Sequence, residues 1–571
     1  MLTRTAAVST LCASAAIGLA VQLAAARPLD GPTFTDIARS AGLTHKIVFG
    51  GSDRNTYILE TTGTGVAFFD YDRDGVLDLL FTNGATIGHE ATAPSLRLYR
   101  GDGSGAFTDV TDRAGVGRSG WGQGVAVADY DNDGFEDVYL TFFGGNVLFH
   151  NNQNGTFSDV TARAGVTAGG WSTSAAWFDY DNDGFLDLFV ARYIDFNVET
   201  APRPGARLPG VNCSYRGFPV MCGPRGLKGM RDVLFRNNGD GTFTDVTERA
   251  GIDVSQYRGL GVVSGDYDND GKVDLFVAND AQPNQLYRNR GGGRFDEEAL
   301  VAGVAVDEDG RERAGMGVDF GDYDNDGWLD LTIGNFSGEP CSLYRNLHDG
   351  TFVETTWSSG IGLLTIPALT WGSKFLDYDN DGWKDLVFVN GHVYPEVDAQ
   401  RLDETYAQRA FLFRNGGKGT FTRMGGDAGG VWNERWAGRG AAIGDFDNDG
   451  DLDVAVAVVN GAPRLLRNNG ENAGHWLTVS LLGTTSNRDA IGARLTARAG
   501  ERTITEEVSS GGSYLSHNDR RIHIGVGEAT RIDTLEVSWP SGTKERLGPL
   551  EVDSFITIKE GSGAVSRVRS R

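Results

Sequence analysis

The sequence predicts an all-β fold: a seven-bladed β-propeller closed by an N-terminal strand, with a C-terminal small β-sandwich-like domain. Three observations predict it. The acidic pattern DYDNDGFLD (Asp179–Asp187) has six near copies, and a hairpin pattern such as LFRNNGDGTFTDVT (234–247) recurs between them. Glycine is abundant, at 81 of 571 residues, which is typical of many short strands joined by tight turns.

Each repeat supplies four strands. Apolar segments flank the acidic loop, for example STSAAWF before Asp179 and FLDLFVA ending at Ala191, and the NNGDG-type turn joins two more strands. Four antiparallel strands in a unit of about 55 residues form one propeller blade. EF-hands require helices around a twelve-residue loop and nonapeptide rolls repeat every nine residues, so neither fits.

The two ends of the repeat region predict ring closure. The last repeat stops at LLRNNG (465–470) without a GTFTDVT strand, and FTDIARSAGL (34–43) has this missing sequence. We therefore expect the N-terminal strand to complete the last blade and remove the sheet edge at the seam. We expect the propeller over 27–470, the C-terminal β-domain, whose segments alternate as strands do, over 471–560, and a disordered tail over 561–571.

Each acidic loop is a candidate calcium site. Ca²⁺ takes six to eight oxygen ligands, and Asp179, Asp181 and Asp183 offer carboxylates on alternate residues. Gly184 permits the turn, after which the Phe185 carbonyl can point inward and Asp187 can complete the shell. A metal-free acidic hairpin turn is the alternative for one copy, but seven copies in phase would repel without a cation.

The sequence therefore predicts about seven Ca²⁺ ions as cofactors. The expected ligands are Asp70, Asp72, Asp74, Val76, Asp78, Asp129, Asp131, Asp133, Phe135, Asp137, Asp179, Asp181, Asp183, Phe185, Asp187, Asp266, Asp268, Asp270, Lys272, Asp274, Asp322, Asp324, Asp326, Trp328, Asp330, Asp377, Asp379, Asp381, Trp383, Asp385, Asp445, Asp447, Asp449, Asp451 and Asp453, where the seventh position of each loop contributes its backbone carbonyl.

Export is expected from the first residues and the cysteines. Residues 1–26 have the charged start, apolar run and small-residue cleavage site of a signal peptide, although an uncleaved anchor is the alternative. No later apolar stretch is long enough to span a bilayer, so the mature chain is not expected to be an integral membrane protein. Cys213 and Cys222 favour a local disulfide over two free thiols, and the state of Cys341 is left open. We expect a secreted protein, extracellular or periplasmic.

The surface opposite the acidic loops is the candidate ligand face. Two insertions, 193–230 and 392–409, follow second strands and belong there, since long loops on a rigid scaffold commonly carry binding. An aromatic and arginine rim near the channel could bind sugars or anions, and packing between blades is the alternative. The rim residues are Glu60, Trp121, Trp171, Arg258, Arg313, Trp371, Trp436 and Arg439.

Catalytic signatures are not found in the sequence. The eight histidines show no zinc spacing, and no nucleophile elbow or phosphate loop occurs. Outside the acidic loops, Glu60, Glu396 and Asp398 are the candidate acids, with ordinary loop polarity as the alternative. In the C-terminal domain, a polar cluster predicts either a turn network or a ligand site. It consists of Tyr514, Asn518, Asp519, Arg520 and Arg521, with Asn487 and Arg488 open to the same two interpretations.

These motifs resemble known families. The repeats resemble the FG-GAP/VCBS repeats of integrin α-subunit-like propellers. CSYRGFPVMCGPRGL (213–227) and NGHVYPEVD (390–398) resemble the cartilage acidic protein family, and NRDAIGARLTARAG (487–500) and GGSYLSHNDRRIHIGVG (511–527) resemble the ASPIC/UnbV domain. The resemblance implies a secreted calcium-binding propeller with an appended β-domain.

The expected function is therefore a non-catalytic interaction scaffold whose partner is an unidentified extracellular protein or glycan. The net charge of −25 disfavours nucleic acid as a partner. Two alternatives stay open: a carbohydrate-active hydrolase or lyase that uses the channel mouth, and an assembly partner of another exported protein.

Overall fold

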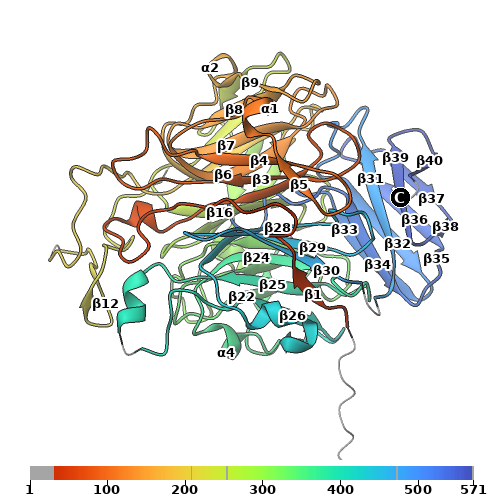
Figure 1. Ribbon diagram of the computed structural model, residues 1–571. Helices are drawn as coiled ribbons and strands as arrows, with labels where there is room; N and C mark the ends of the chain where they lie inside the picture. The colour runs from red at the N-terminus through yellow and green to blue at the C-terminus, as the bar shows by residue number, and fades with distance from the viewer. Residues whose placement is uncertain (1–30, 208, 253–254, 401, 471–472, 569–571) are drawn as a thin grey trace, which may run out of the picture. The chain divides into compact units, whose positions relative to one another are not determined.

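Strand pairing confirms the predicted all-β propeller fold. The computed structural model describes residues 31–207, 209–252, 255–400, 402–470 and 473–568, so the predicted signal segment 1–26 lies outside the described residues. The strands of each repeat pair antiparallel with one another, and each acidic loop joins the first two strands of a set (Figure 1).

Seven sets of four strands follow one another along the described chain. The first strands are β2 (Val66–Phe69), β6 (Trp121–Ala128), β10 (Gly170–Phe178), β16 (Gly259–Gly265), β20 (Val318–Gly321), β24 (Thr370–Leu376) and β28 (Gly438–Gly444). The second strands are β3 (Asp78–Thr82), β7 (Asp137–Gly144), β11 (Asp187–Arg192), β17 (Asp274–Asn279), β21 (Asp330–Ile333), β25 (Asp385–Asn390) and β29 (Asp453–Val458). The third strands are β4 (Leu96–Gly101), β8 (Val147–Asn151), β14 (Val233–Asn237), β18 (Gln285–Gly291), β22 (Ser342–Asn346), β26 (Phe411–Asn415) and β30 (Arg464–Asn468). The fourth strands are β5 (Phe107–Asp109), β9 (Phe157–Asp159), β15 (Phe243–Asp245), β19 (Arg294–Glu297), β23 (Phe352–Glu354), β27 (Phe421–Met424) and β1 (Phe34–Asp36).

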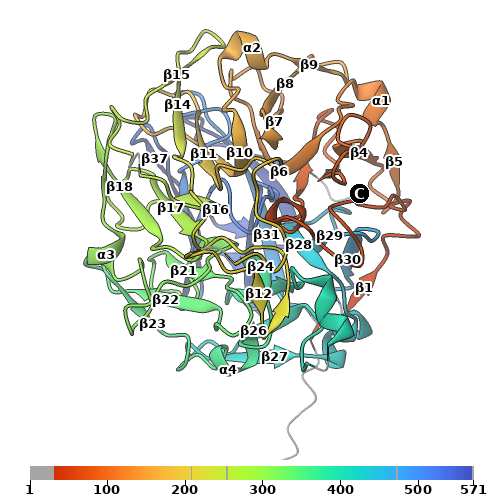
Figure 2. The ribbon, with the colours of Figure 1, turned by 90° about the vertical axis from the view of Figure 1, so that its left-hand side faces the viewer.

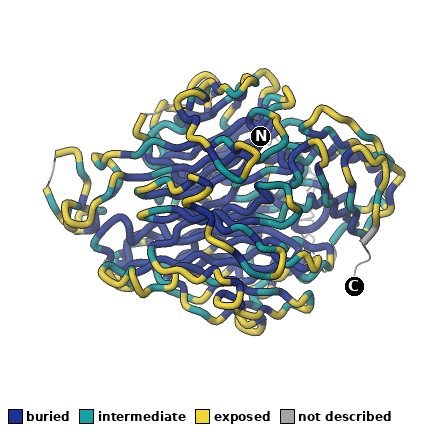
Figure 3. The backbone as a smooth tube through the Cα atoms, turned by 90° about the horizontal axis from the view of Figure 1, so that it is seen from above, coloured by how far each residue is buried: buried dark blue, intermediate teal, exposed yellow. Residues whose placement is uncertain are grey.

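The first strands surround a common axis (Figure 2). Each contacts the next in the order β2, β6, β10, β16, β20, β24, β28 and again β2. Glycine is required where neighbouring first strands approach closely. A Cβ atom at Gly317 would lie only 1.9 Å from the Trp371 carbonyl oxygen. Figure 3 shows buried residues through the interior and exposed residues gathered at the outer bends of the tube.

The N-terminal strand completes the last set, as predicted. β1 pairs antiparallel with β30, with Phe34 opposite Asn468. The Phe34 ring is buried and packs edge-on against Trp432 at a centroid distance of 5.3 Å. The first strand of the chain therefore fills the position that the last repeat leaves open.

Short helices connect several sets, and the sequence pattern did not reveal them. After β5, the Asp109 carboxylate accepts hydrogen bonds from the Thr111 N–H (3.0 Å) and hydroxyl (2.7 Å), and Gly115 ends the turn at φ 74°. One turn of helix is too short to show periodicity. The helices are α1 (Thr111–Ala114), α2 (Thr161–Ala164), α3 (Ala299–Ala302) and α4 (Gly362–Thr365), with 3-10 turns η1 (Ile58–Glu60), η2 (Pro395–Ala399), η3 (Gly426–Ala428) and η4 (Gly430–Asn433).

The two insertions cover the end of the ring opposite the acidic loops. The first carries the hairpin of β12 (Ser214–Tyr215) and β13 (Phe218–Pro219), and the predicted disulfide between Cys213 and Cys222 is present, with an S–S distance of 2.09 Å. Figure 1 shows β12 at the opposite end from the C-terminal strands. Cys341 is a buried free thiol, and burial raises its pKa.

The C-terminal domain consists of two four-stranded sheets. The strand-like alternation expected from its sequence is confirmed, and a shared apolar core that includes Leu477, Leu495 and Val537 lies between the sheets. One sheet contains β34 (Ile522–Gly527), β31 (His475–Leu482), β39 (Ser554–Lys559) and β40 (Val565–Val568). The other contains β33 (Arg502–Glu507), β32 (Arg494–Ala499), β36 (Thr534–Ser538) and β37 (Lys544–Leu547), and β35 (Arg531–Ile532) pairs with β38 (Leu550–Glu551).

The expectation of a disordered tail from residue 561 was wrong for residues 565–568. These residues form β40, which pairs antiparallel with β39, with Val565 opposite Ile558. The pairing satisfies backbone groups that β39 would otherwise leave open at the sheet edge. Residues 569–571 lie outside the described residues.

Residues 510–519, between β33 and β34, enter the centre of the ring, and we call this segment the plug. The Leu515 carbonyl accepts a hydrogen bond from Val125 of β6 (3.0 Å), and the Ser513 carbonyl accepts one from Val318 of β20 (3.0 Å). A Cβ at Gly65 would lie 1.7 Å from the Leu515 carbonyl oxygen, so the approach requires glycine. Further plug contacts reach β2 through His517, β10 through Ser510, β16 through Gly512, β24 through Tyr514 and β28 through Asp519.

Candidate metal centres of the repeats

The first aspartate of each acidic loop shapes the turn. Asp179 accepts hydrogen bonds from the backbone N–H groups of Asp183 (3.0 Å) and Gly184 (2.8 Å). Gly184 has φ 89°, which only glycine adopts freely. The same pair of bonds is present in all seven loops, at Asp70, Asp129, Asp179, Asp266, Asp322, Asp377 and Asp445.

The aspartate at the ninth position of each acidic loop bonds both to the loop and to the third strand of its repeat. Asp187 is fully buried, and its two oxygens accept hydrogen bonds from Tyr180 (3.0 Å) and Asn237 (2.8 Å). Each of the seven loops repeats this arrangement at its last aspartate. The loop is therefore preformed by backbone donors.

The third position of six loops carries a buried carboxylate oxygen that no protein group meets. In these six loops, one oxygen at this position has neither a hydrogen-bond nor an ion-pair partner among the described residues, whereas the corresponding buried oxygen of Asp268 pairs with Nε of Arg288. A buried anionic oxygen is costly unless a cation or a donor meets it. The six residues are Asp72, Asp131, Asp181, Asp324, Asp379 and Asp447.

The loop carboxylates converge tightly enough for one ion. In the loop of Asp179, Asp181 and Asp187, one oxygen from each lies within 4.8 Å of the others. Burial, with added repulsion from Asp183 and Asp181, raises the pKa of Asp179 to about 7. An all-oxygen set of this kind fits a hard divalent cation, which would favour the ionised carboxylates. The backbone carbonyls of the seventh loop positions remain predicted ligands. At Phe185, for example, the backbone N–H donates to Asp183, and this bond does not involve the carbonyl.

A basic residue on each third strand lies beside the acidic loop, which sequence reasoning missed. Arg236 forms ion pairs with Asp181 (2.6 Å) and Asp183 (2.5 Å). The repeated LYR, LFR and LFH motifs of the sequence could have revealed this basic residue. These residues are Arg100, His150, Arg236, Arg288, Arg345, Arg414 and Arg467.

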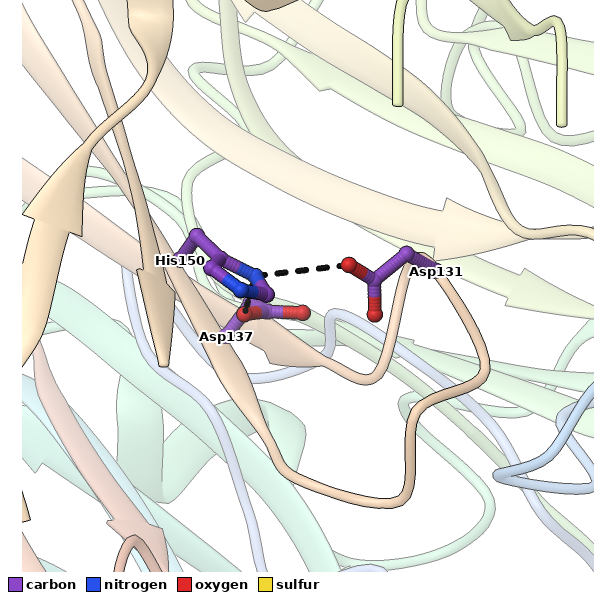
Figure 4. Close-up of side chains that lie close together, drawn as sticks. All are labelled: Asp131, Asp137 and His150. Carbon is purple, nitrogen blue, oxygen red and sulfur yellow. Dashed lines mark ion pairs between the residues drawn. The ribbon is translucent and has the colours of Figure 1, made fainter. Parts of the chain in front are cut away.

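The second repeat has histidine in place of this arginine (Figure 4). Nδ1 of His150 lies 3.3 Å from Asp131 and 3.2 Å from Asp137. The close approach of Asp137 raises the pKa of His150. The three side chains could also hold a metal ion together.

Side-chain amides link each repeat to its neighbours. Nδ2 of Asn237 donates to the Tyr130 carbonyl of the preceding repeat at 2.8 Å, and Asn151, Asn289, Asn346, Asn415 and Asn468 make the same bond. A second set joins loop to loop: Nδ2 of Asn448 in the last loop donates to the Gly75 carbonyl of the first at 3.0 Å. Equivalent loop links start from Asn132, Asn269, Asn325 and Asn380. The acidic loops therefore form a connected ring.

The C-terminal domain docks on this ring of loops. The Arg488 N–H donates to the side chain of Asn132 at 2.8 Å, and Arg521 donates to the Asp445 carbonyl at 2.6 Å. Arg494 and Arg502 donate to the carbonyls of Gly327 and Asp381. The predicted polar cluster of Tyr514, Asn518, Asp519, Arg520 and Arg521 thus belongs to the plug and its flank.

The structure buries the predicted rim on the opposite face, which agrees with the alternative of packing and not with a solvent-exposed binding rim. Seven of the eight predicted residues are at most 7% exposed, and Arg313 is half-buried beside Glu354 at 2.6 Å. The insertions pack over them in one apolar cluster that contains Trp121, Trp171 and Trp371. The buried residues are Glu60, Trp121, Trp171, Arg258, Trp371, Trp436 and Arg439.

The polar members of this set bind backbone groups instead of solvent. Glu60 accepts hydrogen bonds from the Thr56 N–H (2.7 Å) and the Tyr57 N–H (2.9 Å). The guanidinium groups of Arg258 and Arg439 each donate to four backbone carbonyls. Their role in the structure is therefore to hold the channel end closed.

The two distinctive insertion motifs meet on this face. The Tyr215 hydroxyl donates to Glu404 at 2.7 Å, and its ring packs against His392 at a centroid distance of 5.3 Å. Glu396 is largely buried and lies 3.8 Å from Arg54, whereas Asp398 accepts the Tyr406 N–H at 2.8 Å. The motifs thus cap the channel together.

Two family models match the chain. The model described as FG-GAP-like repeat matches residues 87–140, 129–190, 226–277, 266–333 and 322–388, and the model described as ASPIC and UnbV matches residues 483–565. Cartilage acidic protein 1 of Homo sapiens is 28% identical over 321 residues, which cover 55% of this chain and 46% of that protein. The Xenopus tropicalis protein of that name is 25% identical over 515 residues, covering 86% of this chain and 73% of that protein. The match spans about half the length of the human and mouse relatives.

Solved structures show more distant similarity. An Agrocybe aegerita lectin described as recognising non-reducing terminal N-acetylglucosamine has a TM-score of 0.38 at 16% identity, covering 63% of this chain and 79% of that one. Trypanosoma rangeli sialidase has a TM-score of 0.33 at 11% identity, covering 76% and 59%. Among the described residues, no helix combines the length and apolar character needed to cross a membrane.

Proposed function

Because the chain is built from FG-GAP-like repeats and an ASPIC and UnbV domain and is homologous to cartilage acidic protein 1, we propose that it is an exported, calcium-stabilised propeller that acts as a non-catalytic interaction scaffold. The observation that supports the calcium assignment is the unpartnered, buried carboxylate oxygen at the third position of six of the seven loops. A bound cation would supply the counter-charge that these six equivalent oxygens lack.

Export is supported by the chemistry of the chain. A disulfide between Cys213 and Cys222 is stable in an oxidising compartment, where free Ca²⁺ is also abundant. The predicted signal segment is consistent with that location. The proposed location is extracellular, as part of a secreted protein.

A scaffold role is supported by how the channel-end residues are used. Glu60 and Arg439 are buried and bonded to backbone, so they serve the closed cap of the channel. The exposed partner surface is then the outer side of the first insertion, where Arg203, Arg207 and Arg225 face solvent. We propose that an extracellular protein or glycan binds there. Loss of glycan-array binding in an Arg207→Glu/Arg225→Glu variant would support this surface, whereas turnover of a polysaccharide would favour an enzyme.

Metal analysis tests the calcium assignment directly. The purified chain should contain about seven calcium ions, and EDTA should lower its Tm steeply, because bound metal stabilises each site by about 2–3 kcal/mol when Ca²⁺ is a hundredfold above Kd. A folded chain without divalent ions, melting identically in EDTA, would contradict the proposal.

One loop variant separates metal binding from charge repulsion. Asp181→Asn should remove about one calcium ion and lower the Tm by a few degrees in calcium, because one ligand charge is lost. In EDTA the same variant should not be destabilised, because it removes a repelling carboxylate. The control is Asp240→Asn, in the exposed turn of the same repeat, where Asp240 contacts only Thr242.

A further inference from the structure

A cavity of about 480 Å³ lies where the C-terminal domain meets the first, second and seventh acidic loops. Its wall combines apolar side chains, including Val76, Leu481 and Phe555, with charged ones. Small-molecule sites typically have this size and this mixture of an apolar wall with a few polar groups. The cavity is separate from the insertion face and borders the candidate metal centres of the first, second and seventh loops.

Two arginines converge at this cavity from distant parts of the chain. A Cβ built at Gly134 in the second loop would lie 2.9 Å from a guanidinium nitrogen of Arg73 and 3.9 Å from one of Arg488. Within the described part of the chain, neither arginine forms an ion pair: Arg73 packs over the Phe135 ring at 5.2 Å, and Nε of Arg488 is buried without a hydrogen-bond partner. Two converging, unpaired cations repel each other unless an anion lies between them.

The acidic residues of the cavity wall do not supply that anion. Asp70, Asp74, Asp129 and Asp447 belong to the acidic loops, so this step rests on the proposed calcium sites. Glu136 and Asp489 both form ion pairs with Arg520. Asp519 pairs with Arg521 at 2.8 Å. Arg73 and Arg488 therefore remain as the positive charges without a counter-ion.

Arg73 also departs from the repeat pattern at a structural cost. The fourth loop position is asparagine in the other six loops, and in five of them its amide donates to the glycine carbonyl of the next loop. The first loop lacks this amide, so the link to Gly134 is replaced by a guanidinium group at the cavity. Arg73 therefore replaces the hydrogen bond between neighbouring loops with an unpaired positive charge, and such a departure from the repeat pattern indicates a binding role.

We propose that Arg73 and Arg488 bind the oxyanion of a small organic acid, a carboxylate or a sulfate ester, whose organic part lies against Val76 and Phe555. Guanidinium groups match both oxyanions through paired N–H donors. The ligand is recognised jointly by the propeller and the C-terminal domain, so its binding also strengthens their contact.

Titration calorimetry on the calcium-loaded chain tests this site, with glucuronate and inorganic sulfate as probes and glucose as the neutral comparison. Glucuronate should bind, glucose should not, and Arg73→Asn and Arg488→Gln should each weaken glucuronate binding about tenfold or more. Arg73→Asn introduces the residue of the six sister loops and so should fold normally. Arg546→Gln, at an exposed pair with Glu536, is the matched control.

Each outcome bears on the proposal. Sulfate binding as tightly as glucuronate indicates recognition of the oxyanion alone, and tighter glucuronate binding indicates that the organic part contributes. No binding of either probe, or binding that both arginine variants leave unchanged, would overturn it. Calcium content measured on the same samples distinguishes failure of the anion site from failure of the calcium sites. A calcium-loaded chain that binds neither anion would contradict the anion site and leave the metal centres supported.

Discussion

At the scale of single residues, an asparagine at or near the end of six of the seven third strands connects two repeats. The Asn237 N–H donates to Asp187 of its own loop, and its side-chain amide donates to Tyr130 of the preceding repeat. The sequence motif predicted only a turn, because the amide's partner lies 107 residues away. By contrast, the loop aspartates could be identified from sequence because their spacing within nine residues repeats in seven loops.

Replacing Asn237 by alanine tests this link. The variant leaves the buried Tyr130 carbonyl without its donor, which should cost about 1–3 kcal/mol of unfolding free energy. Urea denaturation in saturating calcium measures it. The neighbouring Asn238 is exposed and bonds only within its own turn, so Asn238→Ala should change the stability by less than about 0.5 kcal/mol. Equal effects of the two variants would rule out a special role for the link.

His517 of the plug predicts acid sensitivity. Burial lowers its pKa to about 3, below the unfolded value of about 6.5. As the pH falls through 6.5 the unfolded chain takes up the proton first, so this contribution to stability is complete above about pH 6.5 and falls by about 1.4 kcal/mol per pH unit below it. His517→Gln should therefore lose less stability between pH 7 and pH 5 than the wild type does. His89→Gln, on the exposed surface, is the control, and identical pH profiles for all three proteins would contradict the prediction.

At the scale of elements, the closing strand was predictable because its sequence repeats. FTD at residues 34–36 matches FTD at 243–245, and β1 takes the fourth position of the last set as β15 does in its own set. The plug was not predictable in the same way. Its pattern of small and polar residues indicates a turn, and its partners are seven strands that only the closed ring brings together.

Phe34→Ala tests the closing strand. The ring is buried against Trp432 and Tyr378, so its removal should cost about 3–5 kcal/mol and lower the Tm. Differential scanning calorimetry measures the change. Thr35→Ala, at the exposed position of the same strand, should be nearly neutral. A Phe34 variant as stable as the wild type would show that β1 is not needed for closure.

The expected ligand face shows where sequence reasoning failed at this scale. Tryptophan and arginine near a channel mouth are typical of binding sites, but here the insertions fold back over them. The burial of these tryptophan and arginine residues depends on the conformation of two long insertions. That conformation is determined by contacts between distant residues and cannot be read from the loop sequences. The disulfide between Cys213 and Cys222 and the bond from Tyr215 to Glu404 fix it.

At the scale of the whole molecule, we expect two charged loop residues to help orient the C-terminal domain. The eighth loop position is apolar in five loops but is Glu136 in the second and Lys384 in the sixth. Glu136 pairs with Arg520 and Lys384 with Glu506, both from the C-terminal domain. A ring of similar repeats offers several docking positions, and opposite charges at two of them select one.

Double substitution tests this selection. Lys384→Leu alone leaves Glu506 buried without its partner and should cost about 3–5 kcal/mol. Adding Glu506→Leu should restore most of the stability, since leucine occupies the eighth position in four sister loops. Chemical denaturation of the two single variants and the double variant gives the coupling energy. Strictly additive effects would show that the pair does not act as a unit.

The plug has a consequence for the order of events during synthesis. The innermost strand of every repeat contacts the plug, which is synthesised after all of the repeats. The N-terminal strand β1 pairs with β30, which is also synthesised late. No subset of repeats can therefore reach its final state while the ribosome is still producing the rest. Completion of the propeller therefore depends on the C-terminal domain, which is synthesised after all of the repeats.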